Sequence, residues 1–165
     1  MMKIIGIVII AISVILYSIS YYKNYKARPC DIGFFINLIK AYNTELFRTR
    51  KSMIEILSSI NCKNYKVYID EVNSLIANNT YYNAFIHENR YYNCMALNNE
   101  DKVIIEHFFS ELGRSGIKKE IELCSNTLDA LIERKKYADS EFKKIGPLSI
   151  KLGVALSIWV AILLI

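Results

Sequence analysis

Apolar residues form a nearly uncharged run at each end of the chain, and between these runs they recur with helical spacing. The first run, residues 4–20, contains 17 residues and no charge. The second run, residues 148–165, is apolar except for Lys151 and two serines. Apolar segments of about 20 residues are long enough to cross a bilayer as helices. The pattern therefore predicts an N-terminal transmembrane helix at 1–22, a helical domain at 23–144 and a C-terminal transmembrane helix at 145–165.

The middle of the chain has apolar residues three or four positions apart and no alternating pattern long enough to predict a strand. Arg28-Pro29 is expected to end the first helix, because proline lacks a backbone N–H, and Asp31 is a suitable N-cap for the next helix. The sequence thus predicts an all-α fold, a small antiparallel bundle of short helices flanked by the two membrane helices. The expected bundle helices are 32–46, 51–60, 65–76, 81–96 and, capped by Asn98 or Asn99, 103–112.

A turn at residues 112–116 is expected to separate these helices from one long helix. Gly113 tolerates positive φ, and Ser115 is the expected N-cap. From Ile117 to Lys144 apolar residues return at helical spacing among charged ones, which predicts an amphipathic helix of roughly 40 Å, a length suited to a stalk. Gly146-Pro147 is expected to kink the chain before the second apolar run.

Basic residues lie on the inner side of both apolar runs. Lys23, Lys26 and Arg28 follow the first run, and Lys143 and Lys144 precede the second. By the positive-inside rule this asymmetry predicts that the domain at 23–144 lies in the cytoplasm.

A cleaved signal peptide is the alternative interpretation of the first run. Ser18 and Ser20 are small residues at plausible cleavage positions, so the mature chain would begin near Tyr21. The protein would then be an extracytoplasmic binding module held by its C-terminal anchor.

Composition and charge argue against several classes of protein. The formal net charge is +5, but residues 23–144 carry 19 basic and 16 acidic groups, a balance of +3 that predicts no nucleic-acid binding. The 2 prolines and 6 glycines are too few for an all-β fold. The cysteines at 30, 62, 94 and 124 are isolated from one another and from histidine, so we expect free, buried or half-buried thiols and no metal or other cofactor.

No catalytic constellation stands out in the sequence. His87 and His107 lie on predicted helices with acidic neighbours, and neither has an identifiable serine or cysteine partner. We therefore interpret the chain as non-enzymatic. A small membrane enzyme would require one of these histidines to meet cysteines or carboxylates in a pocket.

The strongest charge feature is Arg134-Lys135-Lys136, followed by Lys143-Lys144. A helix that approaches anionic lipid headgroups would account for it, since basic residues near a membrane surface are attracted to such lipids. A docking face for an acidic protein partner is the alternative.

The order of these parts resembles the stage III sporulation protein AB family of endospore-forming bacteria. The shared features cover essentially the whole chain: a short apolar N-terminal run, Arg28-Pro29, Glu45-Leu46, the Leu-Gly-x-Ser turn at 112–115, a charged helix and a last apolar run opened by Lys151-Leu152-Gly153.

This resemblance implies a non-enzymatic membrane component of the sporulation channel between mother cell and forespore, similar to the F-type platform protein of type II secretion and type IV pilus systems. It implies a place in the mother-cell membrane with the domain in the cytoplasm, where the secretion-type ATPase, stage III sporulation protein AA, and other channel components would be its partners. Homo-oligomers are compatible with it. The residues we expect at partner contacts are Arg28, Pro29, Gly113, Arg114, Ser115, Arg134, Lys135 and Lys136, although the turn residues could equally be structural.

Overall fold

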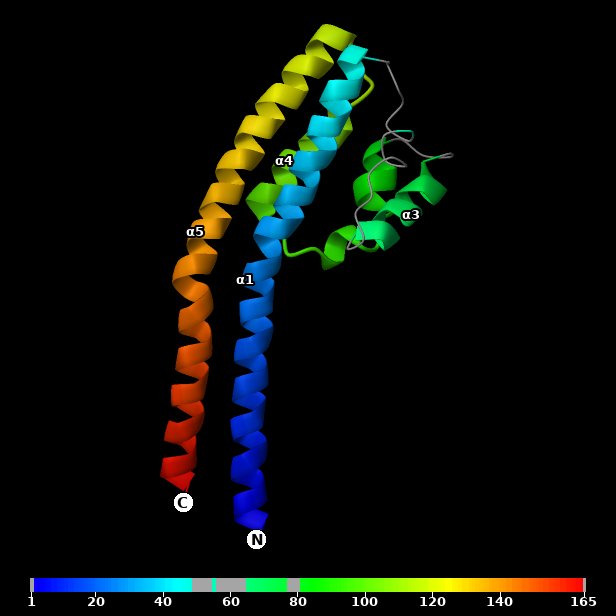
Figure 1. Cartoon of the computed structure of the whole chain (residues 1–165). Helices are drawn as coiled ribbons and strands as arrows, with labels where there is room; N and C mark the ends of the chain where they lie inside the picture. Colours follow the sequence, from blue (N-terminus) through cyan, green and yellow to red (C-terminus); the bar gives the residue numbers. More distant parts are fainter. Residues whose placement is uncertain (1, 49–54, 56–64, 77–80, 165) are drawn as a thin grey trace. The chain divides into compact units, whose positions relative to one another are not determined.

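The structure, a computed structural model, describes residues 2–48, 55, 65–76 and 81–164 (Figure 1). Throughout this part of the chain the regular structure is helical, which confirms the all-α prediction. Two helices are much longer than expected for a bundle of short helices: α1 has 47 residues and α5 has 48. The elements are α1 (Met2–Arg48), α3 (Lys66–Leu75), the π-helical turn η2 (Asn83–His87), the 3-10 turn η3 (Tyr92–Cys94), α4 (Asn99–Glu111) and α5 (Ile117–Leu164).

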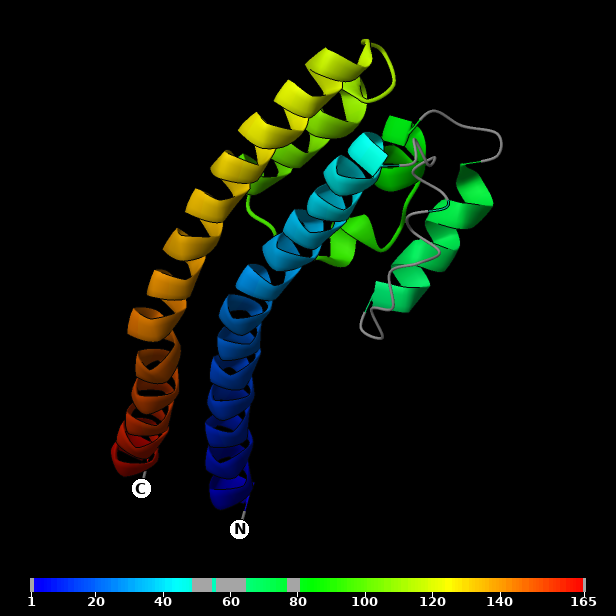
Figure 2. The same ribbon diagram turned by 45° about the horizontal axis from the view of Figure 1, so that its top comes forward.

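The chain divides into two compact units, and both long helices contribute to each. Unit 1 comprises Met1–Pro29 and Lys136–Ile165, and unit 2 comprises Cys30–Lys135. Within unit 2, Figures 1 and 2 show the second half of α1 between α3 and the first half of α5. The described residues of unit 2 therefore belong mainly to segments of four helices and to the two short turns.

The core of unit 2 is rich in aromatic side chains. Phe85 of η2 stacks on Phe109 of α4, with ring centroids 4.2 Å apart and an interplanar angle of 17°. Phe35 of α1 presents edge-to-face contacts to Tyr68, Tyr92 and Phe109. Such contacts add to the stabilisation that burial alone provides. Aliphatic side chains from the same elements complete the buried core: Ile32, Leu38, Ile39, Val72, Ile105 and Leu131.

Unit 1 is a pair of helical segments that lie side by side in opposite directions (Figures 1 and 2). Tyr22 of α1 contacts Phe142 of α5, with ring centroids 5.4 Å apart. Farther toward the chain ends, a Cβ built on Gly153 would lie 1.9 Å from Oγ of Ser18, so the two backbones approach closely there. Glycine is thus required at this crossing because a side chain would overlap the neighbouring helix.

Among the residues whose side chains are described, no helix is both long enough and apolar enough to cross a membrane. The two transmembrane helices expected from the sequence therefore stay predictions.

The predicted break at Arg28-Pro29 is wrong, because α1 continues through Pro29 to Arg48. A proline inside a helix removes one backbone hydrogen bond and costs about 3 kcal/mol. Contacts on both sides offset this cost: Arg28 is paired within unit 1, and Ile32 and Phe35 are fully buried in unit 2. Asp31, the predicted N-cap, lies inside the helix and is buried.

The predicted helix at 81–96 is also wrong in its extent, because the chain leaves the helical path after His87. The buried Oδ1 of Asn89 accepts hydrogen bonds from the N–H groups of Tyr91 and Tyr92, at 3.0 and 3.2 Å. Asparagine side chains of this kind compete with the helical backbone for its donors. The region therefore forms the separate turns η2 and η3.

One predicted boundary of the long helix needs correction, although the helix itself is confirmed. The carbonyl of Gly116 accepts the N–H of Glu120, so Gly116 and not Ser115 occupies the N-cap position. The kink expected at Gly146-Pro147 stays a prediction, and α5 runs through Pro147 to Leu164.

The other predicted helices can be compared directly. The expected helix at 65–76 appears as α3, and Asn98 caps α4 as expected. The helix expected at 51–60 lies outside the described residues, apart from Glu55. Cys124 is buried as expected, whereas Cys30 and Cys94 are exposed, and Cys62 lies outside the described residues.

Candidate interaction surfaces

The turn between α4 and α5 is built around the carboxylate of Glu120. Gly113 adopts φ +79°, a conformation that glycine reaches without strain, and its N–H donates to Oε1 of Glu120 at 3.1 Å. The hydroxyl of Tyr42, from α1, donates to Oε2 of the same carboxylate at 3.2 Å. Glu120 therefore connects the turn to two helices, and Gly113 has a structural role.

Burial around this turn changes the ionisation of its neighbours. Loss of solvent and the nearby Glu120 carboxylate raise the pKa of the Tyr42 hydroxyl well above its usual value. The same two causes raise the pKa of the Cys124 thiol to about 12. Cys124 is therefore a neutral, buried thiol at physiological pH.

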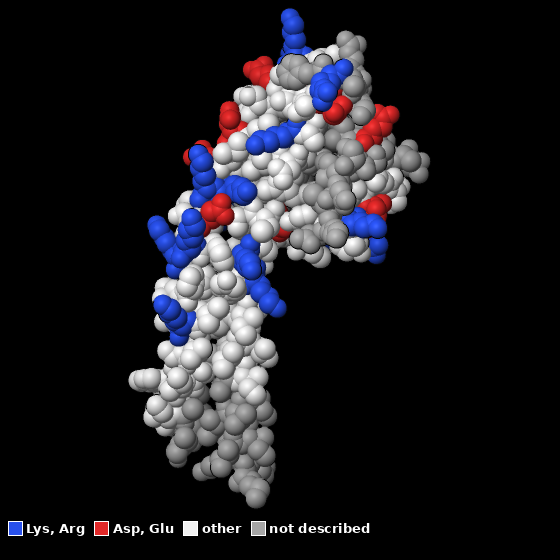
Figure 3. Space-filling view, viewed as in Figure 1, with Lys and Arg blue, Asp and Glu red and all other residues white. Residues whose placement is uncertain are grey.

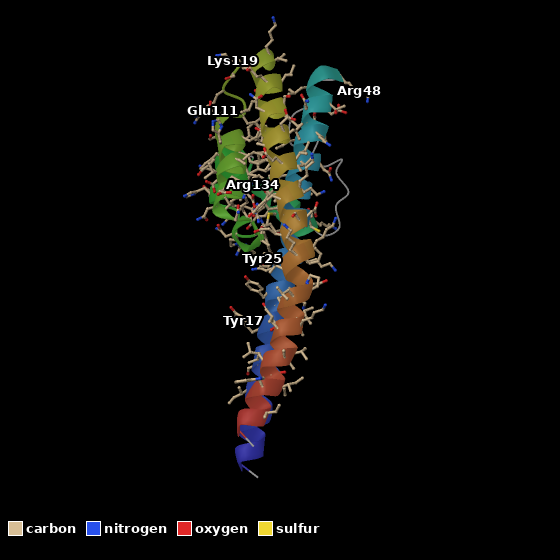
Figure 4. All side chains as sticks on the ribbon, turned by 90° about the vertical axis from the view of Figure 1, so that its left-hand side faces the viewer. Tyr17, Tyr25, Arg48, Glu111, Lys119 and Arg134 are labelled. Atoms are coloured by element: carbon tan, nitrogen blue, oxygen red, sulfur yellow. The ribbon has the colours of Figure 1, made fainter. Side chains whose placement is uncertain are left out.

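Arg134 lies against the N-terminal end of α4. Its Nε donates to Oδ1 of Asp101 at 2.9 Å, and its Nη1 pairs with Glu100. Asp101 is fully buried and forms a capping box with Asn98, in which each side chain bonds the other residue's N–H. Figure 4 labels Arg134 on α5, close to α4. This predicted contact residue thus holds α4 and α5 together.

Lys135 and Arg28 also have internal roles. The end of the Lys135 side chain lies over Gly33 of α1, since a Cβ built on that glycine would be 3.3 Å from Nζ and 3.5 Å from Cε. Arg28 pairs with Glu141 of α5 and lies 6.0 Å from the ring centroid of Tyr137. Pro29 is buried. The predicted contact residues are therefore largely used within the fold, with Arg114, Ser115 and Lys136 left more accessible.

Exposed basic side chains gather at the end of unit 2 that contains the turn. Arg48, in the last turn of α1, and Lys119, near the start of α5, are labelled in Figure 4. The bond between Tyr42 and Glu120 shows that these two segments are neighbours. Arg114 is exposed there as well and makes a long 3.5 Å pair with Glu111. We call this group, Arg48, Arg114, Lys118 and Lys119, the basic tip.

A second group of basic side chains lies on one face of α5 in unit 1. It lines a shallow surface hollow of about 490 Å³, whose residues are Lys136, Asp139, Ser140, Lys143 and Lys144. We call this group the lysine hollow. Figure 3 shows blue lysine and arginine side chains on this part of unit 1, and from there toward the chain ends the described surface is white.

Sequence reasoning missed several residues that organise these surfaces. Asp31 accepts hydrogen bonds from the Tyr65 hydroxyl at 2.8 Å and from the Ala96 N–H at 2.7 Å. Glu120 looked like one charged residue among several on an amphipathic helix. The basic pair Lys118-Lys119 is visible in the sequence, but the sequence does not show which distant basic residues lie near it in space.

The described residues contain no group of three or more histidine, cysteine, aspartate or glutamate side chains arranged to hold a metal ion. His87 and His107 are both exposed.

A family model described as stage III sporulation protein AB matches residues 3–165. The chain belongs to this family. Membership gives the protein a role in sporulation and confirms the resemblance noted in the sequence. No curated protein and no solved structure matches the chain.

Proposed function

We propose that the protein is a non-enzymatic membrane platform of the sporulation channel between mother cell and forespore, and that unit 2 docks the secretion-type ATPase of that channel, stage III sporulation protein AA. The proposal combines membership of the sporulation family with one structural observation. Unit 1 exposes a large apolar surface beyond a band of basic residues.

The apolar surface of unit 1 supports membrane anchoring. Leu16 is 61% exposed on α1, and Trp159 and Ile162 are 69% and 68% exposed on α5. Apolar surfaces of this kind are rare on soluble monomers and usually mark a membrane or a partner. Further exposed apolar side chains follow along both helices: Ile10, Ile12, Ile15, Leu148, Leu152, Val154, Leu156 and Ile158.

Charge supports an orientation with unit 2 in the mother-cell cytoplasm. Basic residues flank the apolar surface where each helix continues into unit 2: Lys23 and Lys26 on α1, and Lys143 and Lys144 on α5. Cytoplasmic segments next to membrane spans carry such an excess of lysine and arginine. A cytoplasmic ATPase would then have access to unit 2.

The basic tip is the surface of unit 2 best suited to an acidic partner. Its cations are exposed, whereas Arg134 is engaged with Glu100 and Asp101 inside the unit. Complementary charge mainly accelerates association and selects the partner, and its effect weakens as salt increases.

The test is binding of the ATPase to the full chain in nanodiscs, measured by calorimetry at low and physiological salt. We expect saturable binding that the double variant Lys118→Glu/Lys119→Glu weakens at least tenfold at low salt. Lys40→Glu/Lys66→Glu is a matched control because both lysines are exposed on other helices of unit 2 and the charge change is equal. Absence of binding, or equal weakening by both variants, would contradict docking at the tip.

Topology is tested separately with Cys94, which is exposed in unit 2. In the variant Cys30→Ser/Cys62→Ser, an impermeant maleimide should label Cys94 only after the mother-cell membrane is permeabilised. Labelling in intact cells would instead place unit 2 outside the cytoplasm and support an extracytoplasmic binding module.

A further inference from the structure

The lysine hollow has the charge and spacing of an anion site. The lining residues recur at intervals of three or four positions, so they lie on one face of α5: Lys136, then Asp139 or Ser140, then Lys143 or Lys144. Three lysines and one aspartate leave a balance of +2 around the hollow.

The cations of the hollow are available, in contrast to the arginine beside it. Arg28 is half-buried and paired with Glu141, one residue from Ser140. Lys136, Lys143 and Lys144 are exposed, and among the described residues no salt bridge shorter than 4.0 Å is recorded for them. Ser140 adds a hydroxyl that can donate a hydrogen bond to an anion.

The register of the two helices brings a second set of lysines to the same level of unit 1. Tyr22 of α1 packs beside Phe142 and within 3.5 Å of a Cβ built on Gly146. Lys23 and Lys26 on α1 are consequently level with the hollow on α5. From this level toward the chain ends, the exposed large side chains that the structure describes are aliphatic or aromatic, with Lys151 as the charged exception among them.

Three neighbouring tyrosines lie on α1 near the transition from basic to apolar side chains. The rings of Tyr17 and Tyr21 stack with centroids 6.4 Å apart, and those of Tyr21 and Tyr25 are 4.9 Å apart. Figure 4 shows Tyr17 and Tyr25 on the same side of α1. Tyrosine is enriched where a protein passes from lipid acyl chains to headgroups, because one end of its ring is apolar and the other is polar.

We propose that the lysine hollow binds the phosphate headgroup of an anionic phospholipid, an inference that rests on the membrane anchoring proposed above. The lipid phosphate sits between Lys136, Lys143 and Lys144, and its acyl chains lie along the exposed apolar side chains that begin at Leu148. A lipid fits better than a free phosphate because the cationic and apolar surfaces adjoin each other on α5. A lysine close to anionic lipid contributes about 1 kcal/mol, so each lysine of the hollow should strengthen lipid binding by about fivefold.

The test uses the full chain in neutral detergent micelles, titrated with short-chain phosphatidylglycerol and followed by native mass spectrometry. We expect saturable binding of phosphatidylglycerol, and weaker binding of phosphatidylcholine of the same chain length. Lys143→Gln/Lys144→Gln should weaken phosphatidylglycerol binding at least tenfold. The matched control, Lys118→Gln/Lys119→Gln, removes the same charge from the start of α5 and should leave binding unchanged.

Three results would overturn the proposal. These are equal binding of the two lipids, equal loss in the two variants, and binding of glycerol 3-phosphate as tight as that of the lipid, which would indicate a free-phosphate site. Far-UV circular dichroism of each variant checks its fold, and both exposed lysine pairs can be changed without disturbing buried contacts. Carbonate extraction of the native protein separates the two proposals. Release from the membrane would contradict the anchoring itself, whereas retention without lipid preference would contradict the headgroup site alone.

Discussion

Arg134 was expected at a partner contact, but its position predicts that replacing it destabilises unit 2. Its guanidinium bonds Asp101, which is fully buried, and pairs with the exposed Glu100. The substitution Arg134→Met keeps the length and apolar stem of the side chain and removes its charge. Asp101 would then lose its bond from Arg134 while it stays buried, and the N–H of Asn98 would still donate to it at 3.2 Å.

The cost can be estimated from these contacts. Removing one member of a buried ion pair costs about 3–5 kcal/mol, and the remaining bond to Asn98 reduces this, so we expect Arg134→Met to lower the free energy of unfolding by about 2–4 kcal/mol. Asp101→Ala should cost about 2–4 kcal/mol, because it removes the capping box as well as the partner of Arg134. The double variant should be about 1–2 kcal/mol more stable than the sum of the single effects predicts, since each single variant already removes the same bond between Arg134 and Asp101.

The assay is urea unfolding of the full chain in detergent, followed by far-UV circular dichroism, with amide hydrogen exchange of α4 as a local measure. Exchange in α4 should accelerate in both single variants. Lys118→Met is a control of the same kind at an exposed position of α5 and should change the unfolding free energy by less than about 0.5 kcal/mol.

Additive effects of Arg134→Met and Asp101→Ala would refute the reasoning, because they would show that the two groups do not interact. Unchanged stability combined with weaker ATPase binding would restore Arg134 to the contact role expected from the sequence.

Three further predictions follow from buried or close contacts. Phe109→Ala should lower the unfolding free energy by about 3–5 kcal/mol in urea, because Phe109 is 1% exposed and stacks on Phe85. Gly153→Val should weaken the pairing of the helices in unit 1, at a cost of about 1–3 kcal/mol, because its Cβ would overlap Ser18. The distance between α1 and α5, followed by disulfide cross-linking or by fluorescence energy transfer, should increase. Cys124 should stay unreactive toward iodoacetamide at pH 8, while the exposed Cys94 reacts. Unit 2 should also lose stability as pH rises from about 9 toward 12, because the Cys124 thiol ionises at a lower pH in the unfolded chain than in the folded one.

Each of these predictions has its own control. Tyr91→Ala removes a partly exposed aromatic ring and should cost far less than Phe109→Ala; equal costs would argue against the aromatic core. Gly6→Val should leave the pairing in unit 1 unchanged, since nothing lies within 4 Å of a Cβ built there. Rapid alkylation of Cys124 in the folded protein would contradict its burial. Cys124→Ala should reduce the loss of stability above pH 9, and the remaining loss would come from phenols such as that of Tyr42, whose pKa is also raised.

Features that depend on neighbours in the chain could be predicted from the sequence. The all-α fold follows from apolar residues at helical spacing, and the caps of α4 and the turn at Gly113 follow from residues a few positions apart. Asn98 and Asp101 bond each other's N–H within one turn, so their capping box is visible as a local motif. Gly113 provides the positive φ that the turn requires.

Tertiary structure decided the features that depend on distant partners. Pro29 and Asp31 looked like a helix boundary, and only contacts with Tyr65 and Ala96, 34 and 65 residues from Asp31, account for an aspartate inside a continuous helix. Arg134 looked like a free cation because Asp101 lies 33 residues away. Helical spacing specifies which residues face inward, but it carries no information on which distant group meets a buried charge. The sequence by itself therefore determined the helical class, the N-cap of α4 and the turn at Gly113. Packing determined which charged residues stabilise the fold and which stay exposed.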